Sequence, residues 1–143
     1  MNMTIKQIRR WAAAVAAICL LTLFLPLYGM TAFAATARIA FSDPTASVGS
    51  EINVKMKITS SDNLSTADIM LAYDPGSLEF IEGTNAEGGN GAVRVHGDGG
   101  GANTTTLAYD LKFKASAAGT SKITVTSQEI YDASSQIVTV DKQ

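Results

Sequence analysis

The stretch from Thr66 to Phe80, TADIMLAYDPGSLEF, constrains the fold more than any other part of the sequence. Its first half alternates strictly between two sets of side chains, and a period of two indicates a strand with one buried face. We therefore expect a strand that packs on a core with one side and faces outward with the other. The inward set is Ala67, Ile69, Leu71 and Tyr73, and the outward set is Thr66, Asp68, Met70 and Ala72.

A tight corner follows this strand at Asp74-Pro75-Gly76-Ser77. Pro75 fixes φ at the value that the second position of a turn requires, and Gly76 can supply the positive φ of a type II turn. Leu78 and Phe80 then resume the inward pattern. The sequence predicts two short strands that meet at a type II turn.

The same alternation recurs along the chain. Glu51–Thr59 places Ile52, Val54, Met56 and Ile58 on one side, and Thr104–Lys114 does so with Leu107, Tyr109, Leu111 and Phe113. Shorter strands are expected at Ala37–Phe41, Ala92–His96, Ser121–Thr126 and Gln136–Val140, with loops or irregular structure at Ser60–Ser65, Gly83–Gly91 and Gln128–Ser134.

These eight or so strands predict an all-β fold built as a two-sheet sandwich. No window after the first 34 residues has the spacing of an amphipathic helix. Periodicity alone fits a jelly roll and an immunoglobulin-like sandwich equally well.

The first 34 residues have the layout of a secretory signal peptide. Three basic residues precede an apolar run, Trp11–Leu27, and Ala32-Phe33-Ala34 is a cleavage signal. We expect a signal-peptide helix at 1–34 and one sandwich domain at 35–143, secreted or at the cell surface. An uncleaved membrane anchor is the alternative, and Ala35-Thr36-Ala37 is a second cleavage signal.

The charge of the mature domain argues against two classes of partner. Of eleven basic residues three lie in the signal segment, which leaves eight against thirteen acidic residues and a net charge of about −5. Nucleic acids and anionic membranes attract basic surfaces. We expect no nucleic-acid partner, and membrane contact only through the signal segment if it is not cleaved.

The sequence predicts no catalytic residue, no cofactor and no metal site. Cys19, the single cysteine, lies in the apolar run, so a disulfide or thiolate site in the mature domain is excluded. His96 is the single histidine and has no recognisable nucleophile pattern around it. The loop aspartates lack the spacing of an EF-hand, although a calcium site assembled across loops stays open.

Carbohydrate binding would need exposed flat aromatic rings. Four of the mature aromatic residues have inward parity, and only Tyr131 is expected to be free. A sugar platform is therefore a weaker alternative than a protein-binding surface.

The mature part resembles the cohesin domain, the bacterial module that receives dockerin domains. The resemblance rests on the order of several short pieces. They are Ala37-Arg38-Ile39, Val48-Gly49, Tyr73-Asp74-Pro75 with Leu78-Glu79-Phe80, Leu107–Lys114 with Ala118-Gly119-Thr120, and Glu129-Ile130-Tyr131-Asp132. The resemblance implies a nine-stranded jelly roll and non-catalytic reception of a dockerin on one sheet face.

An Asn-x-Asp pair helps receive the dockerin in that family, and Thr66 and Asp68 occupy its positions here. Asp68 matches and Thr66 departs, so the implied docking set is Thr66, Asp68, Met70 and Ala72; the alternative for Asp68 is an ordinary solvated charge. The segment between His96 and Thr104 is also shorter than in the family. We therefore expect a short, divergent cohesin-like module.

The resulting hypothesis is an exported, non-catalytic module that binds a protein partner, for example a calcium-loaded dockerin. The alternatives are a structural or adhesin-type spacer of a cell-surface protein and a carbohydrate-binding module.

Overall fold

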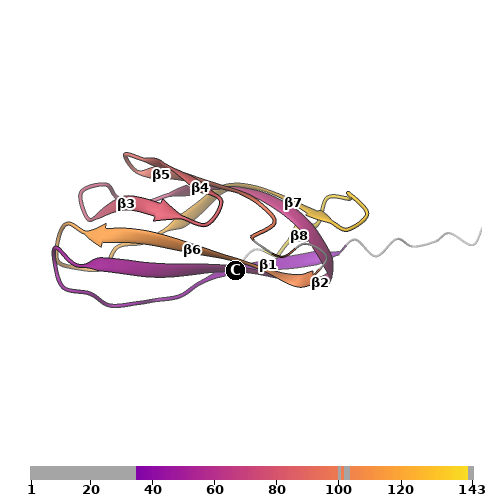
Figure 1. The fold of residues 1–143 in the computed structure, drawn as a ribbon, viewed down its shortest axis with the longest axis horizontal. Helices are drawn as coiled ribbons and strands as arrows, with labels where there is room; N and C mark the ends of the chain where they lie inside the picture. Colours follow the sequence, from indigo (N-terminus) through magenta and orange to yellow (C-terminus); the bar gives the residue numbers. More distant parts are fainter. Residues whose placement is uncertain (1–34, 100, 102–103, 142–143) are drawn as a thin grey trace, which may run out of the picture. The chain divides into compact units, whose positions relative to one another are not determined.

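The computed structural model describes residues 35–99, 101 and 104–141, and this part of the chain is all-β (Figure 1). No helix in these ranges is long and apolar enough to cross a membrane. The predicted signal peptide lies outside the described residues. The strands are β1 (Thr36–Phe41), β2 (Glu51–Ala72), β3 (Leu78–Gly83), β4 (Ala86–Gly89), β5 (Ala92–Gly97), β6 (Thr104–Ala115), β7 (Thr124–Asp132) and β8 (Thr139–Val140).

Strand β2 belongs to both layers of the sandwich. Its first half pairs antiparallel with β1 and β6, and its second half pairs antiparallel with β5 and β7. The predicted loop Ser60–Ser65 is wrong, because β2 continues through it. Ser60 is opposite Ala37 and Leu64 is opposite Asp132, so neighbouring strands hold this polar segment extended despite its composition.

The buried side of β2 changes parity along its length. Met56 and Ile58 are buried in the first half, whereas Ile69 and Leu71 are buried in the second. Leu64 is still buried at an even position, whereas Ala67 is buried at an odd one, so the parity changes between them. The pairing register with β7 shifts at the same place, between Leu64 and Thr66. A bulge of this kind bends a strand and redirects its side chains.

One core fills the space between the layers. Strands β8, β1, β2, β6 and β3 are neighbours in one part of the ladder, and β4, β5, β2 and β7 in the other. Figure 1 shows β6 and the first half of β2 in one layer, and β4 and β5 in the other. The two-layer all-β prediction is confirmed. The largest fully buried side chains are Tyr109, Phe113, Met56, Ile58, Leu64, Ile69, Leu71, Leu107, Leu111 and Ile130.

Aromatic side chains pack together at the end of the core next to the Asp74–Ser77 corner. Phe113 lies edge-on to Tyr73 with ring centroids 5.3 Å apart, and edge-on to Phe80 at 5.5 Å. Each such pair adds about 0.5–1.5 kcal/mol beyond the burial of its area. Three of the four rings predicted to be inward are therefore packed together, with Phe113 in contact with the other two.

The tight corner at Asp74 is present, but it is not a type II turn. The φ of Gly76 is not positive, and the Asp74 carbonyl accepts from the amides of Ser77 and Leu78, at 3.1 and 3.0 Å. The Asp74 carboxylate also accepts from the Gly76 amide at 2.9 Å and from the Ser77 hydroxyl at 2.6 Å. This side-chain cap selects a helical turn, so the predicted turn type is wrong.

Strand β4 lies inside the predicted loop Gly83–Gly91. It joins β5 through Asn90 and Gly91, whose φ angles are 52° and 93°. Two central residues with positive φ make a type I′ turn, the connection that matches the twist of a hairpin. The glycine-rich composition indicated a loop, but the Asn-Gly pair was the signal for this hairpin.

The end of the chain also differs from expectation. Residues 128–132, predicted to be irregular, continue β7, because β7 pairs with β2 from Asp132 to Thr124. The predicted strand at Ser121 begins only at Thr124, and the last strand is only Thr139–Val140.

Substituting the two adjacent glycines of β4 should have unequal effects. Both have φ of 151°, but a Cβ on Gly88 would lie 2.7 Å from the Val93 Cα and closer still to the Ala92 carbonyl oxygen, whereas Gly89 has open space. Gly88→Ala should therefore cost about 1–3 kcal/mol more than Gly89→Ala, the usual cost of overpacking. Urea unfolding of both variants measures this difference, and equal midpoints would contradict it.

Candidate functional site

The four predicted docking residues lie together on the outer side of the second half of β2. Thr66, Asp68, Met70 and Ala72 are all half-buried, and they alternate with buried residues. Strands β5 and β7 flank them, and β4 lies beyond β5. We call this surface the β2-centred face. It consists of Thr66, Asp68, Met70 and Ala72 of β2, Ala92, Arg94 and His96 of β5, Glu87 of β4, and Ser127, Glu129 and Tyr131 of β7.

Pairing register places charged groups around Asp68. Asp68 is directly opposite His96 on β5 and Glu129 on β7, and Arg94 is one diagonal step away. Residues in these positions have Cβ atoms close enough for side-chain contact. The centre of the face is therefore polar.

Arg94 and Asp68 form a bidentate ion pair. Arg94 Nε donates to Asp68 Oδ1 at 2.9 Å and Nη2 donates to Oδ2 at 2.5 Å. The side chains are 49% and 37% exposed. The hydrogen bonds from Arg94 lower the pKa of Asp68 below its ordinary value, and the same contact raises the pKa of Arg94.

Sequence reasoning missed Arg94. The buried residues Val93 and Val95 on either side of it indicate an outward side chain, so its orientation could have been inferred. The contact between Arg94 and Asp68 could not have been inferred, because the register between strands β2 and β5 is not visible in the sequence. The pair depends on a cross-strand alignment of residues 26 positions apart.

The remaining polar groups lie around this pair. His96 Nε2 is 4.0 Å from Glu87 Oε1. The Tyr131 hydroxyl donates to Glu129 Oε2 at 3.2 Å, and this contact raises the pKa of Tyr131. The face thus holds three carboxylates and one guanidinium, an arrangement suited to recognising a charged surface.

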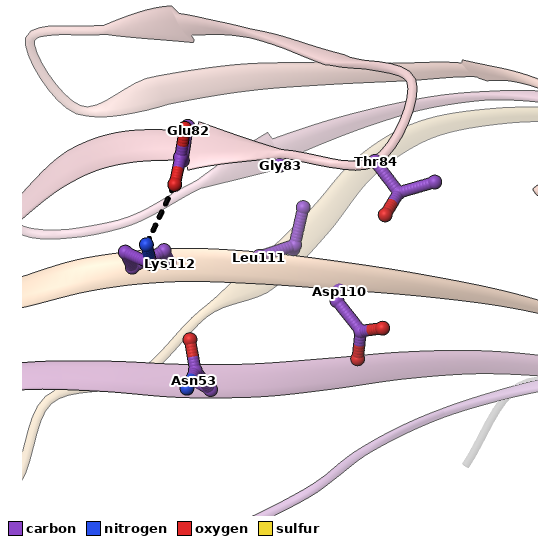
Figure 2. A pocket seen from close by; sticks show the side chains of 7 residues that line it. All are labelled: Asn53, Glu82, Gly83, Thr84, Asp110, Leu111 and Lys112. Carbon is purple, nitrogen blue, oxygen red and sulfur yellow. Dashed lines mark hydrogen bonds and ion pairs between the residues drawn. The ribbon is translucent and has the colours of Figure 1, made fainter.

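A shallow pocket of about 280 Å³ lies elsewhere, over β3, β6 and the first half of β2 (Figure 2). Its charged groups already pair with neighbours: Lys112 Nζ is 2.6 Å from Glu82 Oε1, and Asp110 Oδ1 is 3.2 Å from Lys55 Nζ. Its lining residues are Asn53, Glu82, Gly83, Thr84, Asp110, Leu111 and Lys112, and none is aromatic. Within 35–99, 101 and 104–141, no three His, Cys, Asp or Glu residues are grouped to hold a metal ion.

The Arg94 contact should be visible as a titration. Above the unfolded-state pKa of about 3.9 the pair stabilises the fold, and this stabilisation disappears as the pH falls through the lower folded-state pKa of Asp68. Arg94→Ala should raise the pKa of Asp68 toward its ordinary value, measured by carboxyl-carbon NMR. Lys55→Ala, which breaks a pair with Asp110, should leave the Asp68 titration where it is. An Asp68 pKa unchanged by Arg94→Ala would contradict the contact.

No family model and no curated protein matches the chain. Solved structures do match. A cohesin from Acetivibrio cellulolyticus scaffoldin B, in complex with a Cel5 dockerin, is 21% identical with a TM-score of 0.62, and the match covers 74% of this chain and 93% of that one. A non-cellulosomal cohesin from Archaeoglobus fulgidus is 23% identical with a TM-score of 0.59, over 75% and 84%.

A type I cohesin–dockerin complex from Clostridium thermocellum matches at 16% identity and a TM-score of 0.61, over 73% of this chain and 94% of that one. At identities this low, the structural matches establish the architecture alone, and all three matched structures share that architecture. The described domain therefore has the jelly-roll fold of cohesin domains.

Proposed function

We propose that this domain is a non-catalytic protein-binding module that receives a dockerin-type partner on the β2-centred face. The observation that supports this most directly is the placement of four half-buried residues of β2 at the centre of an open sheet face. The fold adds to it, because cohesins of the same architecture from Acetivibrio cellulolyticus and Clostridium thermocellum are in complex with dockerins.

The face suits a protein partner rather than a small molecule. Its outward residues lie on four neighbouring strands, which spans roughly 14 Å at the usual strand spacing of about 4.8 Å. Met70, Ala72 and Ala92 make one end apolar, and the Asp68–Arg94 pair occupies the centre. A partly apolar surface with ordered polar groups is typical of specific protein interfaces.

The proposal extends to location and ligands. The domain would be exported by the signal peptide predicted at residues 1–34, and it would act outside the cell or at its surface. The partner would be a calcium-loaded dockerin that carries its own calcium, so the domain itself would need no cofactor.

Asp68→Arg should weaken capture of a calcium-loaded dockerin at least tenfold. The substitution breaks the pair with Arg94 and sets two like charges side by side at the centre of the face. Surface titration against a panel of calcium-loaded dockerins measures the loss. Asp110→Arg is the matched control, because Asp110 is an exposed, paired acid on the outer side of β6, and its dockerin binding should not change.

Three results would contradict the proposed function. One is equal dockerin affinity of the Asp68→Arg variant and the unaltered domain. The second is that no dockerin is captured, and the third is that capture persists after a chelator removes the calcium. Failure to capture any dockerin would favour a structural spacer instead.

A further inference from the structure

The carboxylate expected to receive a partner is already occupied within the domain. Both oxygens of Asp68 accept hydrogen bonds from Arg94, and the two side chains remain partly exposed. We propose that Arg94 is a specificity-determining residue of the β2-centred face, because it presents a partner with a closed guanidinium–carboxylate pair instead of a free carboxylate. This inference rests on the proposed dockerin-binding function.

The pair has a definite chemical preference. A guanidinium has five N–H donors, and Asp68 engages two of those on Arg94, on Nε and Nη2. The other donors can serve acceptor oxygens of a partner, such as a side-chain carboxylate, an amide or a backbone carbonyl. A partner that places a lysine or arginine over Asp68 meets the positive charge of Arg94 at the same place. The face should therefore select an acceptor opposite Arg94 and reject a cation opposite Asp68.

The surroundings of the pair reinforce this geometry. Arg94 is directly opposite Met70 on β2 and Glu87 on β4, and Asp68 is directly opposite His96 on β5 and Glu129 on β7. The hydrogen-bonded pair thus lies in the interior of the face, with strands on both sides. Groups near the centre of an interface lose water on binding, and there the choice between donor and acceptor has its largest effect on affinity.

A purely structural role for Arg94 makes a different prediction. Exposed ion pairs contribute little to folding stability. If Arg94 had only a structural role, replacing it would therefore leave both the fold and the choice of partner unchanged. Lysine keeps the charge but lacks the planar fork of donors. Arg94→Lys therefore tests the hydrogen-bonding geometry separately from the charge.

The experiment measures dissociation constants of a panel of calcium-loaded dockerins for the unaltered domain and for Arg94→Ala, Arg94→Lys, Asp68→Ala and the Asp68→Ala/Arg94→Ala double variant. Arg94→Ala should weaken the dockerin bound by the unaltered domain at least tenfold, and Arg94→Lys should fail to restore it. The double variant should lose less than the two single losses combined, because the groups act as a pair. Lys55→Ala, which breaks an exposed ion pair with Asp110 on the outer side of β2 and β6, should stay within twofold of the unaltered domain.

Each result is decisive. Gain of a dockerin that only Arg94→Ala captures would support selection by Arg94, as would the tenfold loss. Dockerin affinities within twofold for both Arg94→Ala and Arg94→Lys, in variants whose urea midpoints show a folded domain, would overturn this inference and leave the proposed function intact. Absence of capture by the unaltered domain and by every variant would overturn both.

Discussion

The shift of the buried side of β2 from even to odd positions is the constraint on which the rest of the structure depends. Val54 and Met56 line the core from one layer, and Ile69 and Leu71 line it from the other, although all four lie on one strand. A strand in uniform register would expose one of these two sets. The register shift between Leu64 and Thr66 prevents this, so a single strand can supply both walls of the core.

The same shift determines where the candidate site lies. With odd positions buried in the second half of β2, the even positions from Thr66 to Ala72 must face outward. The flanking strands then bring Arg94 and Glu129 to the same side, since cross-strand neighbours share a face. Core packing thus creates the surface that we propose for partner binding, and no separate element is needed to build it.

The sequence predicts what depends on local periodicity. Alternation was enough to predict which side chains of β2 and β6 are buried, because a strand with one buried face has a two-residue hydrophobic pattern. It was insufficient where long-range pairing overrides composition, as in the polar segment after Thr59 and in the glycine-rich β4. The Asp74 turn differed for a local reason, since a side-chain cap can select a helical turn even where a Pro-Gly pair favours type II. The candidate site followed the same division: the β2 residues were predictable, and Arg94 was not, because its contact depends on interstrand register.

The two outer sides of the sandwich handle charge differently. On the outer side of β2 and β6, Lys55 lies next to Asp110, and Lys112 lies between Glu82 and Glu51, so opposite charges neutralise one another across strands. The β2-centred face holds three carboxylates and one guanidinium. Arg94 pairs with Asp68, so Glu87 and Glu129 leave an excess of negative charge around a neutral central pair. Excess charge at the periphery accelerates the approach of a complementary partner, whereas the central pair acts only at contact distance. If the proposed function holds, attraction and selection would therefore reside in different residues, the first in the peripheral carboxylates and the second in Arg94.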